Sequence, residues 1–462
     1  MAIKRLFIAN RGEIAVRIIR AAKAMGIHTI QAHSEADADM LAVRLADEAV
    51  CIGPAQAALS YLNVEGVVAA AKATHADAVH PGYGFLAENA GFVRALDAAG
   101  IIFVGPSADT IDAMGDKVSA RQAAQAAGVP VVPGSKGRVE TIDDAVDVAA
   151  KIGYPVMIKA AAGGGGKGIR IADTEAELRK MAPQAQAEAK ASFGDGGLYL
   201  ERAIQSPRHI EVQIMGDGTN AVHYFERECS LQRRRQKVWE EAGAECLDES
   251  TRAHLCDTAV ALAKAVNYVG AGTLEYLYDS VTADFYFIEM NTRIQVEHPV
   301  TEMLTGTDLV QEMIHVAGGG KLRQRQSDII RSGHAIEVRL NAEDPFLQFM
   351  PCPGQITGLR VPEGEGIRFD HFLYEGYQIP PFYDSLLGKL IVHGRDRQAA
   401  IDRLFTALKG LEIEGVKTTK PLHLALAQDA SVRSDDFHTQ WLEPWLASGN
   451  LKPTPEITGG TS

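Results

Sequence analysis

Two β-rich runs around a polar turn carry carboxylates at a spacing that suits a bound cation. The run Thr273–Asp279 holds Glu275, and the run Phe285–Arg293 holds Glu289 and Asn291. If the hairpin turn is centred near residue 282, the two glutamates face each other, and like charges destabilise a ladder unless a cation lies between them. Carboxylate and amide oxygens are hard ligands of the kind that Mg²⁺ prefers. The pattern predicts a metal site; a solvated acidic face is the alternative.

A row of polar residues at alternate positions continues from this second run. Arg293, Gln295 and Glu297 follow Asn291 at a spacing of two, which places their side chains on one face while the chain stays extended. A guanidinium there offers a bidentate fork to a planar oxyanion, Gln295 adds a hydrogen bond, and Glu297 is placed to remove a proton. Each residue alone is typical of an exposed surface. Together they predict a site that binds and activates a small anion.

A glycine-rich loop lies between two apolar strands near residue 160. It runs from Lys159 through four consecutive glycines, including Gly165 and Gly166, to Lys167 and Gly168. Gly168 stands where a P-loop has Ser or Thr, so the Walker pattern fails. Four glycines exceed the need of a tight turn and suit backbone N–H groups that approach phosphate oxygens closely, with Lys159 as a fixed charge. A phosphate-covering flap is favoured over a flexible linker, and it strengthens the prediction of a metal site.

A third cluster is the basic run from Cys229 to Glu241, which contains Gln232, Arg235 and Lys237. A solvated loop is one interpretation of such a run. The other is an anion site in which Lys237 or an arginine compensates the charge of a nucleotide or a small acid.

The composition is that of an ordinary globular protein of several domains. The chain has 462 residues with 46% hydrophobic and 23% charged, and two to four domains are expected. The net charge of −13 argues against a nucleic-acid partner, and no apolar run has the ~20 residues of a membrane span. Five cysteines without CxxC spacing fit a reducing cytoplasm better than a disulfide or zinc framework. We therefore expect a cytoplasmic protein without a membrane anchor.

The elements that position these residues change character along the chain. Residues 3–110 alternate apolar strands (3–9, 29–33, 49–52, 78–80 and 102–104) with helices (13–25, 64–74 and 89–99), which predicts a doubly wound parallel sheet. Helices over 118–127 and 142–152, with strands over 155–160, 169–172 and 199–202, predict a small α+β lid. An antiparallel pattern follows over 209–317, and a third portion begins near residue 333. The predicted fold class is a multidomain α/β and α+β protein.

Long ordered motifs along nearly the whole chain resemble one family. They are Ile8–Ile14, His80–Asn89, Met114–Lys117, the glycine flap, Pro207–Gln213, Phe287–Glu302 and Arg339–Asp344. In these motifs the chain resembles the biotin carboxylase components of acetyl-CoA, propionyl-CoA, pyruvate and related biotin-dependent carboxylases. The resemblance implies an ATP-grasp ligase divided into a pre-ATP-grasp domain (1–115), an ATP-grasp lid (116–203), an ATP-grasp catalytic core (204–330) and a C-terminal biotin carboxylase domain (331–446). The prolines and glycines near the end of the sequence predict a disordered tail (447–462).

The resemblance also implies the reaction and the roles of matching residues. ATP and bicarbonate, with Mg²⁺ or Mn²⁺, would carboxylate biotin N1 through carboxyphosphate. The residues implied for the nucleotide are Lys117, Lys159, Gly165, Gly166, Glu201, Arg202, Ala203, Ile204, His209, Gln232 and Arg235. Those implied for the metal are Glu275, Glu289 and Asn291, and those for bicarbonate are Lys237, Arg293, Gln295 and Val296. Glu297 would be the base, Arg339 would stabilise the biotin enolate, and Tyr83 would lie near biotin.

Three positions around Lys237 depart from the family's pattern. Arg235 stands where the family usually has His or Asn, Trp239 where Val is common, and Gly243 where Pro is usual. The Met-Lys-Met biotin-attachment signature and a carboxyltransferase portion are absent from this sequence. We therefore expect a separate biotin carboxyl carrier protein and separate carboxyltransferase subunits as partners, and the resemblance suggests a homodimer. The alternatives are another ATP-grasp ligase that joins an acid to an amine, and a non-catalytic nucleotide-sensing subunit.

Overall fold

The protein forms two compact units. The structure, a computed structural model, describes residues 3–160, 170–193 and 196–452. One unit combines the chain up to Val129 with Arg208–Tyr276 and the chain from Glu289 onward; the other combines Pro130–Pro207 with Leu277–Ile288.

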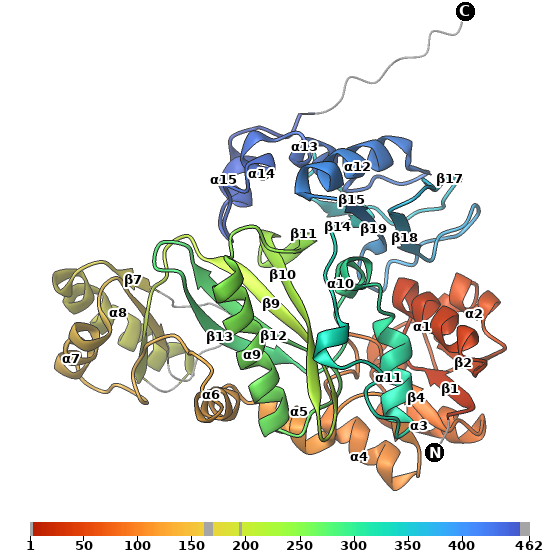
Figure 1. Ribbon diagram of the computed structural model, residues 1–462, viewed down its shortest axis with the longest axis horizontal. Helices are drawn as coiled ribbons and strands as arrows, with labels where there is room; N and C mark the ends of the chain where they lie inside the picture. The colour runs from red at the N-terminus through yellow and green to blue at the C-terminus, as the bar shows by residue number, and fades with distance from the viewer. Residues whose placement is uncertain (1–2, 161–169, 194–195, 453–462) are drawn as a thin grey trace, which may run out of the picture. The chain divides into compact units, whose positions relative to one another are not determined.

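A parallel five-stranded sheet with the strand order β3-β2-β1-β4-β5 begins the first unit (Figure 1). The central strand β1 pairs in parallel with both β2 and β4, so the strand order reverses at β1. Ligands of open α/β sheets bind beyond the carboxyl ends of the strands at such a reversal. The elements are β1 (Arg5–Ile8), α1 (Gly12–Ala24), β2 (His28–His33), α2 (Leu41–Leu45), β3 (Glu48–Cys51), α3 (Val64–Ala73), β4 (Ala78–His80), α4 (Ala90–Ala98), β5 (Ile102–Phe103), α5 (Ala108–Gly115) and α6 (Lys117–Ala126).

The loops after β1 and β4 are tied to each other at this reversal. Asn10 Nδ2 donates to Pro81 O at 2.6 Å and to Tyr83 O at 2.7 Å. Gly12 then begins α1 with a φ of +68°, a conformation that glycine adopts without steric cost. The two loops therefore place Glu13 and Tyr83 side by side. Each strand and helix predicted for residues 3–110 is present, with ends that differ by one or two residues.

An eight-stranded sheet, most of which belongs to the first unit, has the order β13-β12-β9-β10-β11-β14-β19-β18; the parts of β12 and β13 within Leu277–Ile288 belong to the second unit. The pairs β9/β10, β10/β11, β11/β14, β14/β19 and β18/β19 are antiparallel. This order sets side by side segments that lie far apart in the sequence. The elements are β9 (Arg208–Asp217), β10 (Ala221–Arg233), β11 (Gln236–Ala242), α9 (Glu249–Ala265), β12 (Val269–Asp279), β13 (Asp284–Asn291), α10 (His298–Thr305), α11 (Leu309–Ala317), β14 (His334–Asn341), β18 (Ile367–His371) and β19 (Leu386–Gly394).

The C-terminal helices pack on the β11, β14 and β19 end of this sheet. Trp239, Val338 and Leu390 share one buried cluster with Leu404 and Leu426. The remaining elements here are β15 (Glu343–Asp344), β16 (Met350–Pro351), β17 (Gly358–Arg360), α12 (Arg397–Gly410), β20 (Glu412–Glu414), α13 (Lys420–Leu426), α14 (Ala430–Arg433) and α15 (Leu442–Ala447). Among the described helices, none has the length and apolar character needed to cross a bilayer.

The second unit contains a three-stranded antiparallel sheet in the order β7-β6-β8. The Thr141 hydroxyl oxygen caps the first helix by accepting a hydrogen bond from the Asp144 N–H. Apolar residues of both helices of this unit pack against the strands. The elements are α7 (Ile142–Ile152), β6 (Val156–Ala160), β7 (Arg170–Ala172), α8 (Glu175–Phe193) and β8 (Leu198–Arg202). The predicted glycine flap, with Gly165 and Gly166, lies outside the described residues.

Candidate active site

Lys237 of β11 lies at the centre of a buried cluster of carboxylates. Its Nζ donates to Glu211 Oε2 at 2.5 Å, to Glu275 Oε1 at 3.0 Å and to Glu297 Oε1 at 2.6 Å. Glu211 comes from β9 and Glu275 from β12, and Glu297 occupies the N-cap position of α10 without a capping hydrogen bond from its side chain. The sheet order therefore brings together the predicted anion ligand Lys237, the predicted metal ligand Glu275 and the predicted base Glu297.

The charges of this cluster set the protonation states of its members. Burial opposes the ammonium form of Lys237, but the three carboxylates outweigh it and raise the pKa of Lys237 well above its ordinary value. Burial alone would raise the pKa of Glu297, yet Lys237 holds it below its ordinary value. The same balance, with help from His209, holds the pKa of Glu275 below its ordinary value. At neutral pH the cluster is therefore a fixed arrangement of full charges, which is the property that electrostatic catalysis requires.

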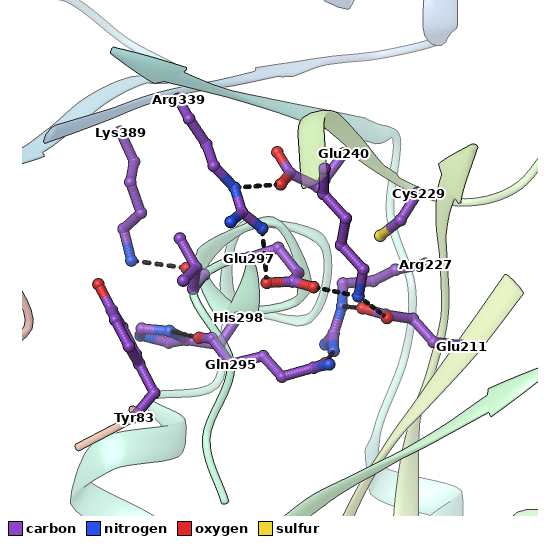
Figure 2. Close-up of polar contacts among 12 residues, drawn as sticks. Tyr83, Glu211, Arg227, Cys229, Glu240, Gln295, Glu297, His298, Arg339 and Lys389 are labelled. Carbon is purple, nitrogen blue, oxygen red and sulfur yellow. Dashed lines mark hydrogen bonds and ion pairs between the residues drawn. The ribbon is translucent and has the colours of Figure 1, made fainter. Parts of the chain in front are cut away.

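Arg227 of β10 supports the cluster from inside the sheet (Figure 2). Its guanidinium is fully buried and donates to Glu211 Oε1 at 2.6 Å and to Gln295 Oε1 at 2.6 Å. Gln295 Nε2 in turn donates to Glu275 Oε1 at 2.9 Å. A buried ion pair with satisfied hydrogen bonds fixes geometry more reliably than it adds stability. Arg227 therefore fixes the orientation of both the Gln295 amide and Glu211.

Arg339 of β14 contacts the carboxylate oxygen of Glu297 that Lys237 does not contact, and Figure 2 shows this contact of Arg339 with Glu297. Its Nε donates to Glu240 Oε1 at 2.5 Å, and its NH2 group donates to Glu297 Oε2 at 3.2 Å. Burial raises the pKa of Glu240 to about 7, against the lowering effect of Arg339. The two oxygens of Glu297 are thus each bonded to a cation, one to Lys237 and one to Arg339. A base that must be ionised before it accepts a proton is stabilised in that form here.

The predicted metal residues lie at one edge of the same cluster. Asn291 Nδ2 donates to Glu275 Oε1 at 2.9 Å, and its Oδ1 accepts from Arg293 at 2.8 Å. Burial raises the pKa of Glu289, and the negative charge of Glu275 raises it further. Like-charge repulsion of this kind is relieved when a cation binds between two carboxylates. The residues at this edge therefore have both the ligand atoms and the excess negative charge that a divalent cation needs.

The predicted extended row is wrong beyond Asn291. The strand β13 ends there, and Glu297 precedes α10 with a φ of −80° and a ψ of 6°. The cause is a tertiary contact, because Glu88 accepts from the Thr292 N–H at 3.0 Å and from Arg293 Nε at 2.9 Å. The side chains of Asn291, Gln295 and Glu297 converge on the cluster through this turn of the chain. Arg293 contacts Asn291 but points its Nε at Glu88.

Residues predicted to bind the nucleotide occur in each of the two units, and several of them form ion pairs or hydrogen bonds within their own unit. In the first unit, His209 Nε2 lies 3.2 Å from Glu275 Oε2; burial disfavours its protonation, but Glu275 and Glu211 outweigh it and raise the pKa of His209 to about 9. Lys117 begins α6. In the second unit, Lys159 donates to Glu201, and Arg202, Ala203 and Ile204 follow at the end of β8.

Gln232 lies near the end of β10, and Arg235 lies in the turn between β10 and β11. Gln232 pairs with Lys237 across the ladder and donates to Cys229 O at 2.8 Å. Arg235 is exposed, with a φ of +66°. Each interpretation of the basic run fits one part of it. The turn at its tip is exposed, as in a solvated loop, whereas the Lys237 ammonium lies in the buried cluster.

Tyr83 lies beside a cavity at the strand-order reversal of the parallel sheet. The cavity has a volume of about 150 Å³ and is lined in part by Asn10, Arg11, Glu13, Tyr83 and Asp384. The Tyr83 hydroxyl donates to Glu13 Oε1. Burial and the negative charge of Glu13 raise the pKa of Tyr83 well above its ordinary value.

Four buried charged residues of the site were not singled out from the sequence. They are Glu211, Arg227, Glu240 and Lys389. Arg227 and Glu240 stand among other polar residues and give no signal in the sequence. Glu211 and Lys389 stand between apolar or glycine neighbours, where the burial of a charge without a partner is costly. That signal marks them as candidates for buried pairing, although a single sequence does not say with which partner.

Three family models together match most of the chain. "Biotin carboxylase, N-terminal domain" matches residues 2–111, "Carbamoyl-phosphate synthase L chain, ATP binding domain" matches residues 116–325, and "Biotin carboxylase C-terminal domain" matches residues 337–444. The chain is 52% identical over 449 residues to Biotin carboxylase 1 of Bacillus subtilis, which covers 97% of this chain and 100% of that protein.

Two solved structures show the same fold. A biotin carboxylase–β,γ-ATP complex from Campylobacter jejuni matches with a TM-score of 0.87 and 48% identity, over 96% of this chain and 99% of that one. The biotin carboxylase domain dimer of Hydrogenobacter thermophilus 2-oxoglutarate carboxylase, in complex with MgADP, ADP and bicarbonate, matches with a TM-score of 0.86 and 46% identity, over 98% and 100% of the two chains.

These matches confirm the predicted fold class, ATP-grasp architecture and ligase class. The family model of the ATP-binding domain spans the residues from Lys117 to Glu297 that form most of the cluster. The chain therefore belongs to the biotin carboxylase family.

Proposed function

We propose that this protein carboxylates N1 of biotin carried on a separate protein, with ATP and bicarbonate as the other substrates. The observation that carries the proposal is the position of Glu297, whose two carboxylate oxygens are bonded to Lys237 and Arg339. A single ionised carboxylate between two cations, next to residues suited to a divalent cation, fits the activation of a small oxyanion for attack on a phosphate.

The first half of the reaction forms carboxyphosphate. Bicarbonate binds to Lys237, Arg293, the Gln295 amide and the Val296 N–H, and Glu297 takes its proton while a bicarbonate oxygen attacks the γ-phosphorus of ATP. The bond from that phosphorus to the ADP oxygen breaks, and ADP leaves. Since Gln295 is held by Arg227 and Glu275, its amide is already oriented before bicarbonate arrives.

Glu275, Glu289 and Asn291 would hold the cation of this site, Mg²⁺ or Mn²⁺. The raised pKa of Glu289, caused by burial and by Glu275, supports this assignment. When bound, the cation supplies positive charge that neutralises the ATP phosphates. The residues proposed to hold the nucleotide are Lys117, Lys159, Gly165, Gly166, Glu201, Arg202, Ala203, Ile204, His209, Gln232 and Arg235.

The second half of the reaction transfers the carboxyl group. Carboxyphosphate breaks into CO₂ and phosphate, and the phosphate takes the proton from biotin N1. The Arg339 guanidinium stabilises the resulting enolate oxygen, and N1 then bonds to CO₂. Tyr83 and its neighbouring cavity hold part of the biotin. Exclusion of water from the site protects CO₂ and carboxyphosphate until the transfer is complete.

The partners follow from the same chemistry. One relative in the family is the biotin carboxylase domain of a larger carboxylase and is a dimer. We propose that this protein also forms a homodimer, receives biotin on a carrier protein and passes the carboxyl group to a carboxyltransferase subunit, all in the cytoplasm.

Fixation of labelled bicarbonate into free biotin tests the function. With ATP and Mg²⁺, the purified protein should form acid-labile ¹⁴C-carboxybiotin, and biotin should stimulate bicarbonate-dependent ATP hydrolysis. Lys237→Met should abolish both, whereas Lys409→Met, at an exposed lysine of α12, should leave both unchanged. ATP hydrolysis that is indifferent to biotin would favour an acid–amine ligase, and ATP binding without turnover would favour a nucleotide sensor.

A further inference from the structure

Lys389 of β19 is a fully buried lysine that contacts the backbone of the anion-binding segment. Its side chain has an exposed fraction of 0%, and its Nζ donates to Val296 O at 2.6 Å (Figure 2). The same Nζ lies 3.2 Å from Glu13 Oε1, whose residue is in the first turn of α1. A buried ammonium is costly unless it is paired and hydrogen-bonded, so its position between a carboxylate and a carbonyl is specific.

The backbone carbonyl groups of Gln295 and Val296 each contact a nitrogen of a buried side chain. His298 Nδ1 lies 2.8 Å from Gln295 O, and Lys389 Nζ lies 2.6 Å from Val296 O. Burial and then the charge of Lys389 keep the pKa of His298 well below its ordinary value, so the neutral ring donates through Nδ1–H. Figure 2 shows His298 and Lys389 on the same side of the segment.

The two contacts set the direction of the N–H groups. A trans peptide is planar, and its N–H points away from its C=O. The contact of His298 with Gln295 O therefore fixes the direction of the Val296 N–H, and the contact of Lys389 with Val296 O fixes the direction of the Glu297 N–H. The second contact also restrains the backbone rotation that places the Glu297 side chain between Lys237 and Arg339.

We propose that Lys389 is a positioning residue for bicarbonate activation: through Val296 O it holds the Val296–Glu297 peptide in the orientation that places Glu297 against the substrate. The inference rests on the proposed function. Glu13 holds the Lys389 ammonium in place, and its Oε1 also accepts from the Tyr83 hydroxyl, so one carboxylate connects the segment to the cavity wall.

A purely electrostatic role for Lys389 gives a different expectation. If Lys389 only neutralises the buried charge of Glu13, then removing both charges together restores both the stability and the bicarbonate-dependent activity of the protein. If Lys389 positions Val296 O, the double variant regains stability but not function, because methionine cannot donate a hydrogen bond. Glu13→Gln with Lys389→Met separates the two roles and also provides a folded protein if Lys389→Met alone unfolds.

The test compares Lys389→Met, Glu13→Gln/Lys389→Met and the control Lys23→Met, whose lysine on α1 is half exposed and paired with Asp47. Bicarbonate-dependent ATP hydrolysis gives kcat and KM for bicarbonate, nucleotide titration gives the Kd of MgATP, and thermal unfolding gives Tm. We expect both Lys389 variants to lose on the order of thirtyfold or more in kcat/KM for bicarbonate, as for a misplaced catalytic group. The Kd of MgATP should stay unchanged, and the double variant should have a Tm close to that of the wild type.

Wild-type kcat/KM for bicarbonate in Lys389→Met, or its recovery in the double variant, would overturn the inference while leaving the proposed function intact. An equal loss in the Kd of MgATP and in kcat/KM would overturn it too, because a general structural defect would then explain both. A wild-type protein without bicarbonate-dependent hydrolysis would overturn the inference and the proposed function together.

Discussion

Lys237 Nζ and Glu297 Oε1 lie 2.6 Å apart, although one residue is on a central strand and the other occupies the N-cap position of a helix. The pair is buried, with exposed fractions of 13% and 2% for the two side chains. Lys237 also bonds to Glu211 and Glu275, so under the proposed function bicarbonate would compete with carboxylates for one ammonium group. The site is therefore charged and ordered before substrate binds.

Glu297→Gln should separate nucleotide binding from bicarbonate chemistry. The amide keeps the shape of the side chain but cannot accept the bicarbonate proton. We expect bicarbonate-dependent ATP hydrolysis to fall by about 10²–10⁴-fold, which is the usual contribution of a general base. The Kd of MgATP should change little. Steady-state kinetics and nucleotide titration measure the two quantities, with Glu375→Gln, at an exposed glutamate, as control. Wild-type turnover in Glu297→Gln would remove Glu297 as the base.

Arg339→Ala should impair biotin carboxylation more than nucleotide binding. The change removes the proposed donor to the biotin enolate and leaves Glu240 and Glu297 without one of their cations. We expect carboxybiotin formation to fall about hundredfold, as for loss of an oxyanion donor, with a much smaller change in the Kd of MgATP. Carboxybiotin yield and nucleotide titration provide the comparison. Equal losses in both would count against the assigned role.

Glu241 should make the stability of the fold depend on acid pH. Burial alone would raise its pKa, but Arg397, bonded through two contacts of 2.7 Å, and His334 hold that pKa well below its ordinary value. A carboxyl with a lowered folded-state pKa stabilises the fold above its unfolded pKa of about 4.5 and loses that contribution as the pH falls below it. Glu241→Gln should therefore cost about 3–5 kcal/mol near pH 7, as for a broken buried ion pair.

Urea unfolding of wild type and Glu241→Gln at pH 7 and pH 4 tests this dependence. The difference in unfolding free energy should be smaller at pH 4, while Glu375→Gln should show no such change. A difference that stays constant between the two pH values would mean that the carboxylate charge does not supply the stability.

Gly243→Pro should destabilise this protein, although proline is usual in the family at this position. Gly243 has a φ of +96°, whereas proline fixes φ near −65°. We expect a cost of about 3 kcal/mol from this mismatch. Gly243→Ala should cost less, about 1–2 kcal/mol from strain in the positive-φ region, although its Cβ would also lie 3.3 Å from His334 Nδ1. Thermal unfolding ranks the variants, and a Gly243→Pro protein as stable as wild type would show that the local backbone adapts.

The sequence predicted local features well and long-range pairing poorly. The strands of the parallel sheet follow from apolar runs and turn residues, and the convergence of Glu275, Asn291 and Glu297 was expected from their spacing. The sequence did not predict how these side chains converge, because the contact of Glu88 with the Thr292 N–H ends the strand early. A contact between residues so far apart in the chain leaves no periodic signal.

The buried supports of the site are the part that spacing does not predict. Arg227 and Lys389 lie on strands whose order in the sheet decides which side chains they meet. Trp239, which stands where valine is common in the family, is a further buried support that its spacing does not predict: it is 1% exposed and donates to Glu241 at 2.8 Å. The division into residues 1–115, 116–203, 204–330 and 331–446, and the cytoplasmic location, stay predictions.

Transfer of oxygen from bicarbonate to phosphate tests the central claim most directly. If Glu297 activates bicarbonate for attack on ATP, hydrolysis in [¹⁸O]bicarbonate with biotin present should yield inorganic phosphate carrying ¹⁸O from bicarbonate, and Glu297→Gln should yield almost none. Phosphate from the wild type that carries oxygen only from water would contradict the account.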